Sequence, residues 1–594
     1  MTVMTQHFFK IDLIHPAHKS HIPVEFPMQD LTKAQKARLA IRTFQTLADA
    51  LTLRGNYRPS GKSGEKLAES LKLFSPEIYG SMVDSRVMEL QGLEYVIDRM
   101  PRGIEKCNRI ILTGNEDFEN TTFEQVIPLK RRRLSYVVSE SEICFVITKG
   151  LTEVYDILTH ITFLSIESQK IQQQVCDKDG RTCSEWHDLG KAANGELVLE
   201  GAVLDQAIWN LSILLGRTYR ETRETYESMI KTHHGQRYNN GLFSIIYSMG
   251  ERIIKEIKFP DEHLTIYFTP SLQEMIAHHK YASKWAGTVK LHLVERGFQE
   301  RPIHIISSNM HSVKNILYGA GALQGMKEDI PTSLYEMIPT LKGKGEEVEA
   351  FAEQHGLTFL PDSSGSNIDV MVIDPAEIDH SSLHPDLNID QEYIKNFKPV
   401  IVVMDYAFGT QAFEVMDELL RPDRFEDKLL TFKFSSISIM GKAGILPGKK
   451  GDIILATAHV MEGTPHNYIV ANDLRPTDFG EKVNVYMGPM VTVLGTSLQN
   501  RDVLERFYSS SWKAVGLEME GGHYQRAINA AVIQGHISSQ VRIRYAYYAS
   551  DNPLHGGQTL AAGSMGSEGI APTYLITKVL IHKILNPPAD RRCD

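Results

Sequence analysis

The chain has 594 residues and carries 63 Lys and Arg against 73 Asp and Glu, which gives a formal net charge of −10. This length suits about two to four domains, and an apolar share of 42% excludes a wholly disordered or collagen-like chain. The acidic excess argues against a general nucleic-acid-binding protein, because such proteins present a basic field to the phosphates.

The cellular compartment follows from the cysteines and the apolar pattern. Five cysteines are too few for a disulfide scaffold, which favours the reducing cytosol. Residues 1–19 show no apolar core followed by a cleavage site, so we expect no secretory signal. Apolar runs of about 18 residues without charge are absent, so we expect a cytoplasmic protein without a membrane partner.

Residues 1–260 read as a mostly helical domain with a small sheet. Thr32 can cap a helix in which apolar residues recur at three- and four-residue steps until Gly55. Further helices are predicted over residues 154–164 and, as one long element, over residues 202–231. Short β-like runs occupy residues 109–112 and 135–138.

Residues 261–594 have a different pattern, in which apolar β-branched runs alternate with helical stretches. The runs at 303–306, 400–404, 437–440 and 453–456 predict strands of an α/β domain with a mixed sheet flanked by helices. The polar stretch near 340–395 is expected to be an insertion in this domain.

Four segments of the second domain combine glycine with polar or acidic residues, at 404–412, 440–447, 515–522 and 548–557. Ligands of α/β sheets bind beyond the carboxyl ends of the strands, where we expect such segments to lie. Each has an ordinary structural explanation when taken alone. Gly441 and Gly444 fit a turn, Glu518 and Glu520 fit an exposed edge strand, and Asp551 fits a turn opener. Their common order along one domain favours a functional site.

In that order the segments resemble motifs of the nucleoside phosphorylase and nucleosidase superfamily. The matching residues are Gly441 to Gly444 followed by Gly451-Asp452-Ile453, then Glu518-Met519-Glu520, then Ser550-Asp551. Within the superfamily the chain is most similar to AMP nucleosidase. The string Ser550-Asp551-Asn552-Pro553-Leu554-His555-Gly556 and the run Gly488 to Thr492 both match motifs of that enzyme. The resemblance covers roughly residues 395–585.

The resemblance implies roles for residues on both sides of a purine N-glycosidic bond. Asp551 would act as the acid toward the purine and Ser550 would orient it, while Glu520 would accept the ribose hydroxyls with Met519 beneath the sugar. The chemistry is sound, because cleavage puts negative charge on the base and positive charge on the ribose. Asp551 must then stay protonated, which a desolvated pocket favours. Glu518 and Thr492 are counted among the substrate-binding residues.

The residues near the expected phosphate decide between phosphorolysis and hydrolysis. Phosphorylases of the superfamily have an Arg two residues before the first glycine of the loop, where this chain has Ile439. Lys442, the backbone N–H groups at Gly409 and Thr410, and His555 are instead candidates to contact a 5′-phosphate. His555 fits equally well as a histidine that satisfies a loop carbonyl.

The sequence therefore predicts hydrolysis of a purine nucleotide, with AMP and water giving adenine and ribose 5-phosphate. One alternative is a purine nucleosidase or phosphorylase that acts on an unphosphorylated nucleoside. Another is a non-catalytic nucleotide-sensing protein. The resemblance also implies a homo-oligomer and a regulatory role for residues 1–260, with a nucleotide or phosphate effector. We expect no cofactor and no metal, since the pairs His233-His234 and His278-His279 are adjacent and point apart on a helix.

Overall fold

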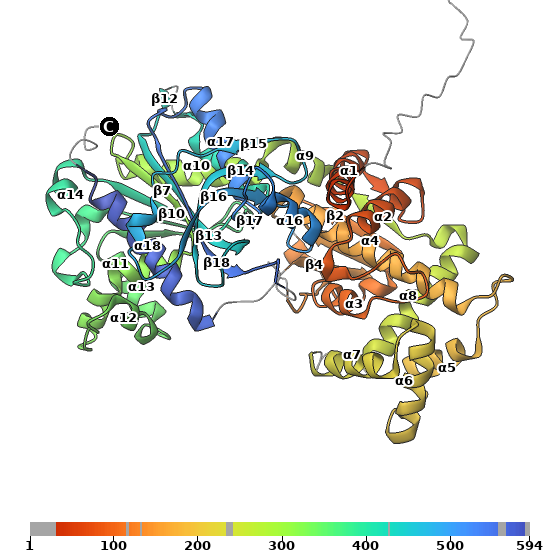
Figure 1. Cartoon of the computed structure of the whole chain (residues 1–594). Helices are drawn as coiled ribbons and strands as arrows, with labels where there is room; N and C mark the ends of the chain where they lie inside the picture. The colour runs from red at the N-terminus through yellow and green to blue at the C-terminus, as the bar shows by residue number, and fades with distance from the viewer. Residues whose placement is uncertain are drawn as a thin grey trace, which may run out of the picture.

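The computed structural model describes residues 31–114, 118–130, 133–232, 241–425, 428–555 and 566–588. His233, His234 and Gly556 lie outside the described residues. The described residues form two large sheets with their own helices, seen as the red-to-yellow and the green-to-blue parts of Figure 1, and one small two-stranded sheet. The expected α/β class is confirmed, with a mostly helical first part and a larger mixed sheet in the second. Among the described helices, none is long and apolar enough to cross a membrane.

The first sheet has six strands in the order β1-β6-β2-β5-β4-β3. Strands β6, β2 and β5 run parallel, and the outer strands pair antiparallel. The bounds are β1 Asn56–Tyr57, β2 Arg109–Thr113, β3 Glu124–Gln125, β4 Leu134–Ser139, β5 Glu142–Val146 and β6 Thr265–Phe268. Because β6 belongs to this sheet, we propose that the division between the two units falls near residue 279 rather than at 260.

The helices of this N-terminal region (residues 31–278) begin with α1, where Thr32 and Gln35 form the capping box and Gly55 ends the helix in a left-handed conformation. The expected boundaries of α1 are therefore confirmed. Helix α4 crosses the interior, and most of its residues are buried. The bounds are α1 Lys33–Arg54, α2 Lys62–Phe74, α3 Leu90–Ile97, α4 Gly150–Val175, α5 Ser184–Ala193, α6 Gly201–Leu215, α7 Tyr219–Thr232, α8 Gly241–Lys258 and α9 Pro270–His278.

The single helix predicted over residues 202–231 is wrong, because the chain breaks at Gly216 into α6 and α7. Gly216 has φ +61°, and a Cβ there would lie 2.0 Å from the carbonyl oxygen of Arg86. The close approach of another backbone segment thus requires a glycine that also turns the chain.

The second sheet has ten strands, with the main order β15-β14-β16-β17-β13-β7-β10-β9-β8 and β18 between β13 and β14. Five of them close a ring, because β13 pairs with β18, β18 with β14, β14 with β16, β16 with β17, and β17 with β13. The bounds are β7 Ile303–Ser307, β8 Leu357–Leu360, β9 Val370–Ile373, β10 Val400–Met404, β13 Phe434–Ile445, β14 Ile453–Met461, β15 Asn467–Ile469, β16 Val485–Thr492, β17 Gly516–Glu518 and β18 Arg542–Asp551. A separate hairpin pairs β11 Asp423–Phe425 with β12 Lys428–Leu430.

Two expectations about this C-terminal region (residues 280–588) need correction. The stretch near 340–395 is not a simple insertion, because its apolar run at Val370–Ile373 forms β9 and joins β8 in the main sheet. The glycine-rich segment at 440–447 is largely strand rather than loop, since β13 continues through Gly441 and Gly444 to Ile445. Parallel pairing with β18 holds it extended.

Helices pack against both faces of this sheet. Alternate residues of β7 and β10 contribute to two apolar clusters, so both faces of these strands are packed. The bounds are α10 Lys280–Glu295, α11 Met310–Gly325, α12 Leu334–Thr340, α13 Gly345–Glu353, α14 Gln391–Phe397, α15 Gln411–Leu420, α16 Arg501–Ser509, α17 Gly521–Ile533 and α18 Ile570–Leu585.

Candidate functional site

A cavity of about 430 Å³ opens where several strands of the second sheet end. The segments Tyr406–Phe408, Ile439–Lys442, Glu518–Glu520 and Tyr547–Tyr548 line most of it. All four regions that the sequence singled out are therefore near one another, and the second and third contribute predicted residues to the lining. Five predicted residues line the cavity, which are Gly441, Lys442, Glu518, Met519 and Glu520.

The cavity exists because two different strands pair with one edge of β13, one after the other along its length. On that edge Ile439 pairs with Ser307 at the end of β7, and Gly444 pairs with Leu517 of β17. Strand β18 occupies the opposite edge through this stretch. Residues 440–443 thus face a gap between two strands that end against β13, and such a gap at strand ends is where α/β sheets bind ligands.

Glu518 is buried and serves to build the site. Its carboxylate accepts hydrogen bonds from Thr492 Oγ1 at 2.5 Å and from the backbone N–H groups of Glu520 and Gly521, and it contacts His459 Nδ1 at 3.2 Å. Burial raises the pKa of Glu518, but these partners outweigh burial and leave it below its ordinary value. Glu518 is therefore ionised and holds the start of α17, with Thr492 as its support.

Glu520 is only partly buried, and its carboxylate lies at the cavity wall. Its Oε1 accepts a hydrogen bond of 3.0 Å from the backbone N–H of Gly409, in the turn between β10 and α15. This bond connects two of the predicted segments directly. Gly409 and Glu520 are thus both in the site, but the N–H of Gly409 is already used within the protein.

Thr410 makes its contacts with the N-terminal region. Its backbone N–H donates to Thr152 Oγ1 at 2.8 Å, and its own Oγ1 accepts from the backbone N–H of Thr152 at 3.3 Å. Thr152 belongs to the first turn of α4, which therefore touches the turn beside the cavity. The sequence showed no signal for this contact, because the two residues are 258 positions apart.

Asp551 lies at the end of β18 and is 2% exposed, but it is not among the residues that line the cavity. Its Oδ1 is 2.5 Å from Ser550 Oγ, which also approaches the carbonyl oxygen of Ala443 at 3.3 Å. Within the described residues, Asp551 Oδ2 has no hydrogen-bond partner. Burial raises the pKa of Asp551, while the Ser550 hydrogen bond and the charge of Lys442 oppose that rise.

Gly444 makes room for the Asp551 side chain beside the cavity. A Cβ at Gly444 would lie 2.8 Å from Leu517 Cδ2 and 3.4 Å from Asp551 Oδ2, so these two side chains meet over the glycine. Lys442 stands two residues earlier on β13, on the same face, and lines the cavity. Asp551 is therefore next to the cavity, with Lys442 adjacent.

Tyrosines form much of the remaining wall, and sequence reasoning assigned them no role. Tyr547 is 3% exposed, and its hydroxyl has no hydrogen-bond partner within the described residues. Burial raises the pKa of Tyr547 well above its ordinary value, so the hydroxyl remains a donor. Tyr524 bonds Ser307 Oγ at 2.8 Å. The aromatic run at 545–548 was visible in the sequence, but an apolar strand explains it equally well.

Like Gly409, Thr410, Ser550 and Asp551, two further predicted residues are not part of the cavity lining. Thr492 is buried behind Glu518, as described above. His555 is exposed in the turn after β18, where its backbone N–H donates to the carbonyl of Asn552. A direct ligand contact by either residue remains a prediction.

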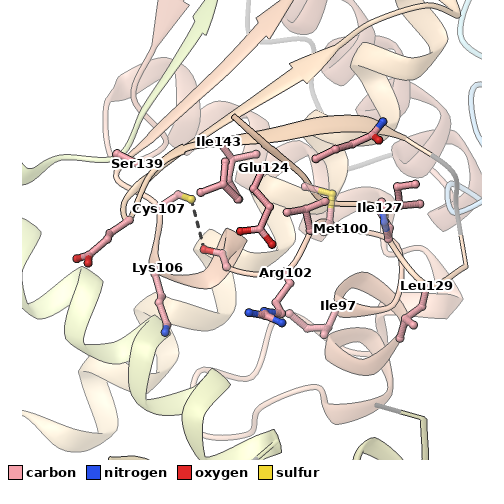
Figure 2. A pocket seen from close by; sticks show the side chains of 16 residues that line it. Ile97, Met100, Arg102, Lys106, Cys107, Glu124, Ile127, Leu129, Ser139 and Ile143 are labelled. Carbon is pink, nitrogen blue, oxygen red and sulfur yellow. Dashed lines mark hydrogen bonds between the residues drawn. The ribbon is translucent and has the colours of Figure 1, made fainter. Parts of the chain in front are cut away.

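A larger cavity, of about 1060 Å³, lies against the first sheet. Figure 2 shows its apolar floor, including Ile143 and Met100, and the charged side chains Arg102, Lys106 and Glu124 at its walls. Cys107 Sγ donates to the carbonyl oxygen of Gly103 there and has a pKa raised by burial. None of the predicted site residues contributes to this cavity.

One group of side chains in the described residues has the spacing of a metal site, formed by His279, Asp417 and Glu418. Arg421 pairs with both carboxylates, at 2.5 Å from Asp417 and 3.1 Å from Glu418. Arg421 therefore offsets one of the two negative charges, and the three charged side chains form an ion-pair cluster.

Searches among solved structures find distant similarities. They include a 5′-methylthioadenosine/S-adenosyl homocysteine nucleosidase of Campylobacter jejuni (11% identity, TM-score 0.27, 48% of this chain and 98% of that chain). Another is the futalosine hydrolase of Helicobacter pylori (12%, TM-score 0.27, 48% and 96%). A third is the uridine phosphorylase of Schistosoma mansoni (13%, TM-score 0.28, 52% and 91%).

Comparison with curated proteins finds no match. One family model matches residues 66–330 and 334–586, which together are most of the chain and include every segment of the candidate site. The chain therefore belongs to the family of unknown function DUF6909.

Proposed function

We propose that this protein cleaves the N-glycosidic bond of a purine nucleoside or nucleotide, with AMP and water giving adenine and ribose 5-phosphate as the leading reaction. The observation that carries the proposal is the meeting of four chain segments around one cavity, with the carboxylate of Glu520 in its wall and the carboxyl of Asp551 buried beside it. A volume of about 430 Å³ falls within the range of small-ligand sites.

Glu520 suits the ribose side of such a ligand. A carboxylate can accept hydrogen bonds from two vicinal hydroxyls, and its charge favours the cationic sugar of the transition state. Glu520 accepts the hydrogen bond of Gly409 through Oε1, and each carboxylate oxygen can accept more than one hydrogen bond. Met519, beside it in the lining, offers an apolar surface to the sugar.

Asp551 suits the side of the purine, because the leaving base needs a proton. Burial raises its pKa, which favours the neutral acid. Ser550 has one hydroxyl proton and two nearby acceptors, the carbonyl of Ala443 and Asp551. Ser550 can donate to Oδ1 of a protonated Asp551 whose own proton is on Oδ2, the oxygen that has no hydrogen-bond partner within the described residues and can donate to the base. The pair then has a consistent arrangement in which Asp551 is neutral.

The contacts at the turn after β10 bear on the 5′-phosphate. The N–H groups of Gly409, Thr410 and Gln411 donate to Glu520, Thr152 and the carbonyl of Phe408, respectively. They are therefore engaged, and this turn does not offer the free donors that a phosphate needs. Lys442 is exposed and lines the cavity, so it is the cation we assign to a 5′-phosphate.

A nucleotide-sensing protein without turnover is the second candidate. The contact between Thr152 of α4 and Thr410 favours it. A ligand in the cavity that moved the turn at Thr410 would change this contact with the N-terminal region. Calorimetry would detect AMP binding in both cases, whereas only an enzyme would release adenine.

The experiment is to incubate the full chain with AMP, adenosine and inosine, with and without inorganic phosphate, and to quantify free base and sugar product. We expect adenine and ribose 5-phosphate from AMP without a need for phosphate. Base release only with phosphate would indicate a phosphorylase instead. Binding of AMP without base release would support the sensor, and neither binding nor release from any substrate would contradict both proposals.

A further inference from the structure

We propose that Thr152, in the N-terminal region, is a positioning residue for the ribose-binding carboxylate of Glu520. The inference rests on the proposed function and assigns a task to the N-terminal region in it. Thr152 would hold the turn at Gly409 and Thr410, and that turn would hold Glu520 in the orientation that the ribose hydroxyls require.

The first step is the contact between Thr152 and Thr410. Their backbone N–H groups donate to each other's hydroxyl oxygens, at 2.8 Å and 3.3 Å, and the two hydroxyl oxygens are 3.2 Å apart. Thr152 is 2% exposed, so water does not readily replace its hydroxyl. Without that hydroxyl, the N–H of Thr410 would lose its acceptor in this part-buried contact, which carries a desolvation penalty.

The second step is the close packing of Gly409 on the same side chain. Gly409 has φ +55°, and a Cβ there would lie 2.2 Å from Thr152 Oγ1 and 2.5 Å from Thr152 Cγ2. The backbone of the turn therefore lies directly on Thr152. Two adjacent residues of the turn are thus fixed by one side chain from another part of the molecule.

The third step leads from the turn to the site. The N–H of Gly409 donates to Glu520 Oε1 at 3.0 Å. The N–H of Gly409 belongs to the peptide unit just before the one that carries the N–H of Thr410, and the two units meet at the Cα of Gly409. A shift of the turn at Thr410 therefore moves this donor relative to Glu520. A carboxylate that lost this donor would be held less firmly in its present rotamer, and part of the ordering cost would then fall on ligand binding.

The test compares Thr152→Val, which removes the hydroxyl, with Thr152→Ser, which keeps it. Thr159→Val is the matched control, because Thr159 is buried on the same helix and donates to the carbonyl of Tyr155 instead. The substrates are adenosine and 2′,3′-dideoxyadenosine, which lacks the hydroxyls that Glu520 would bind. Each variant is assayed as the full chain for kcat and KM.

We expect Thr152→Val to lower kcat/KM for adenosine about tenfold, the size of one lost hydrogen bond. Its effect on the dideoxy substrate should be absent, Thr152→Ser should restore the wild-type value, and Thr159→Val should leave both substrates unaffected. Equal losses on both substrates would show general disruption and overturn the inference, and so would an unchanged rate on adenosine.

Hydrogen exchange separates failure of this inference from failure of the proposed function. Thr152→Val should increase deuterium uptake in peptides covering residues 405–412, where Gly409 and Thr410 donate, while Thr152→Ser should not. If the wild type releases no base from any purine substrate, the proposed function fails. Unchanged uptake would then still overturn the positioning role, and increased uptake would support it.

Discussion

Glu518 and Glu520 lie two positions apart, and their surroundings give them different tasks. The carboxylate of Glu518 is buried and accepts hydrogen bonds from Thr492 and from two backbone N–H groups, so the charge it carries is stabilised by the protein itself. Glu520 lines the cavity and accepts a hydrogen bond from the N–H of Gly409. We therefore assign the ligand to Glu520 and the construction of the site to Glu518.

Asp551 yields the prediction at the residue scale. Asp551→Asn removes the acidic proton but keeps the shape, so we expect kcat to fall at least about a hundredfold while KM changes little. Burial raises the pKa of Asp551 in the folded protein, and the acid form is the active one. Wild-type activity should therefore be present below that raised pKa and decline as pH rises through it.

Steady-state kinetics across pH would check both parts. The residual activity of Asp551→Asn should lack this alkaline decline, and Asp261→Asn, at an exposed position of the N-terminal region, should behave like the wild type. An unchanged kcat in Asp551→Asn would exclude Asp551 as the acid.

Single residues of the site were predictable where a short motif carried them. The motifs with Gly441, Lys442 and the Glu518-Met519-Glu520 run contain five residues that line the cavity, while their contacts with a ligand remain predictions. Thr152 and Tyr547 were missed for different reasons. Thr152 comes from a remote helix, and Tyr547 stands in an aromatic run that a buried strand would also produce.

At the scale of elements, β13 explains where the cavity lies. The strand is extended over Phe434–Ile445, and its edge is shared in turn by β7 and β17. The sequence predicted a strand at 437–440 but placed a loop at Gly441, because glycines are typical of turns. Here Gly444 is needed for a different reason, as Leu517 and Asp551 converge over it.

The turn between β10 and α15 gives the prediction at this scale. Gly409→Ala should destabilise the protein by about 1–3 kcal/mol, because φ is positive and a Cβ would meet three atoms of the Thr152 side chain. Gly451→Ala is the control, since Gly451 also has positive φ but its Cβ would have nothing within 4 Å. Urea unfolding should give the larger loss for Gly409→Ala, and equal losses would contradict the packing argument.

Most elements followed from apolar periodicity, and the exceptions have local causes. Helix α1 was predicted to its ends because Thr32 and Gly55 are strong boundary residues. The break between α6 and α7 was not predicted, because an isolated glycine such as Gly216 is tolerated in helices. Its contact with the backbone of Arg86 is non-local and left no pattern in the sequence. Strands β8 and β9 were not predicted, because they are short apolar runs separated by a polar stretch.

For the molecule as a whole, the interface between the N-terminal and C-terminal regions is the feature that the sequence could not reveal. Thr152 contacts Thr410, Arg38 of α1 contacts the carbonyl of Glu462, and Asn500 donates to the carbonyl of Phe74. These pairs are 258 or more positions apart, and no local pattern links them. The contact between Thr152 and Thr410 lies beside the candidate site, so the N-terminal region packs against one of the turns next to the cavity.

The burial of Glu462 at this interface can be tested through the pH dependence of stability. Burial raises the pKa of Glu462 from 4.5 to about 8, against the opposing charge of Arg38 and the N–H of Leu494. The folded state therefore binds a proton that the unfolded state releases between these values. The stability contributed by this group is fully present below the unfolded pKa and is lost as pH rises to about 8.

Glu462→Gln removes this dependence. We expect the variant to gain melting temperature relative to the wild type as pH is raised from about 5 to about 9, because only the wild type must ionise a buried carboxyl. Thermal unfolding at the two pH values would check this. A difference between the two proteins that does not change with pH would contradict the assigned burial.

The central claim is that one cavity binds a purine nucleoside or nucleotide between Glu520 and Asp551. A crystal structure of the slow variant Asp551→Asn with AMP tests it most directly. We predict the ribose hydroxyls at hydrogen-bond distance from Glu520, about 2.6–3.2 Å, with the purine toward residue 551 and the phosphate toward Lys442. A nucleotide bound only in the larger cavity of the first sheet, or with its ribose turned away from Glu520, would contradict the account.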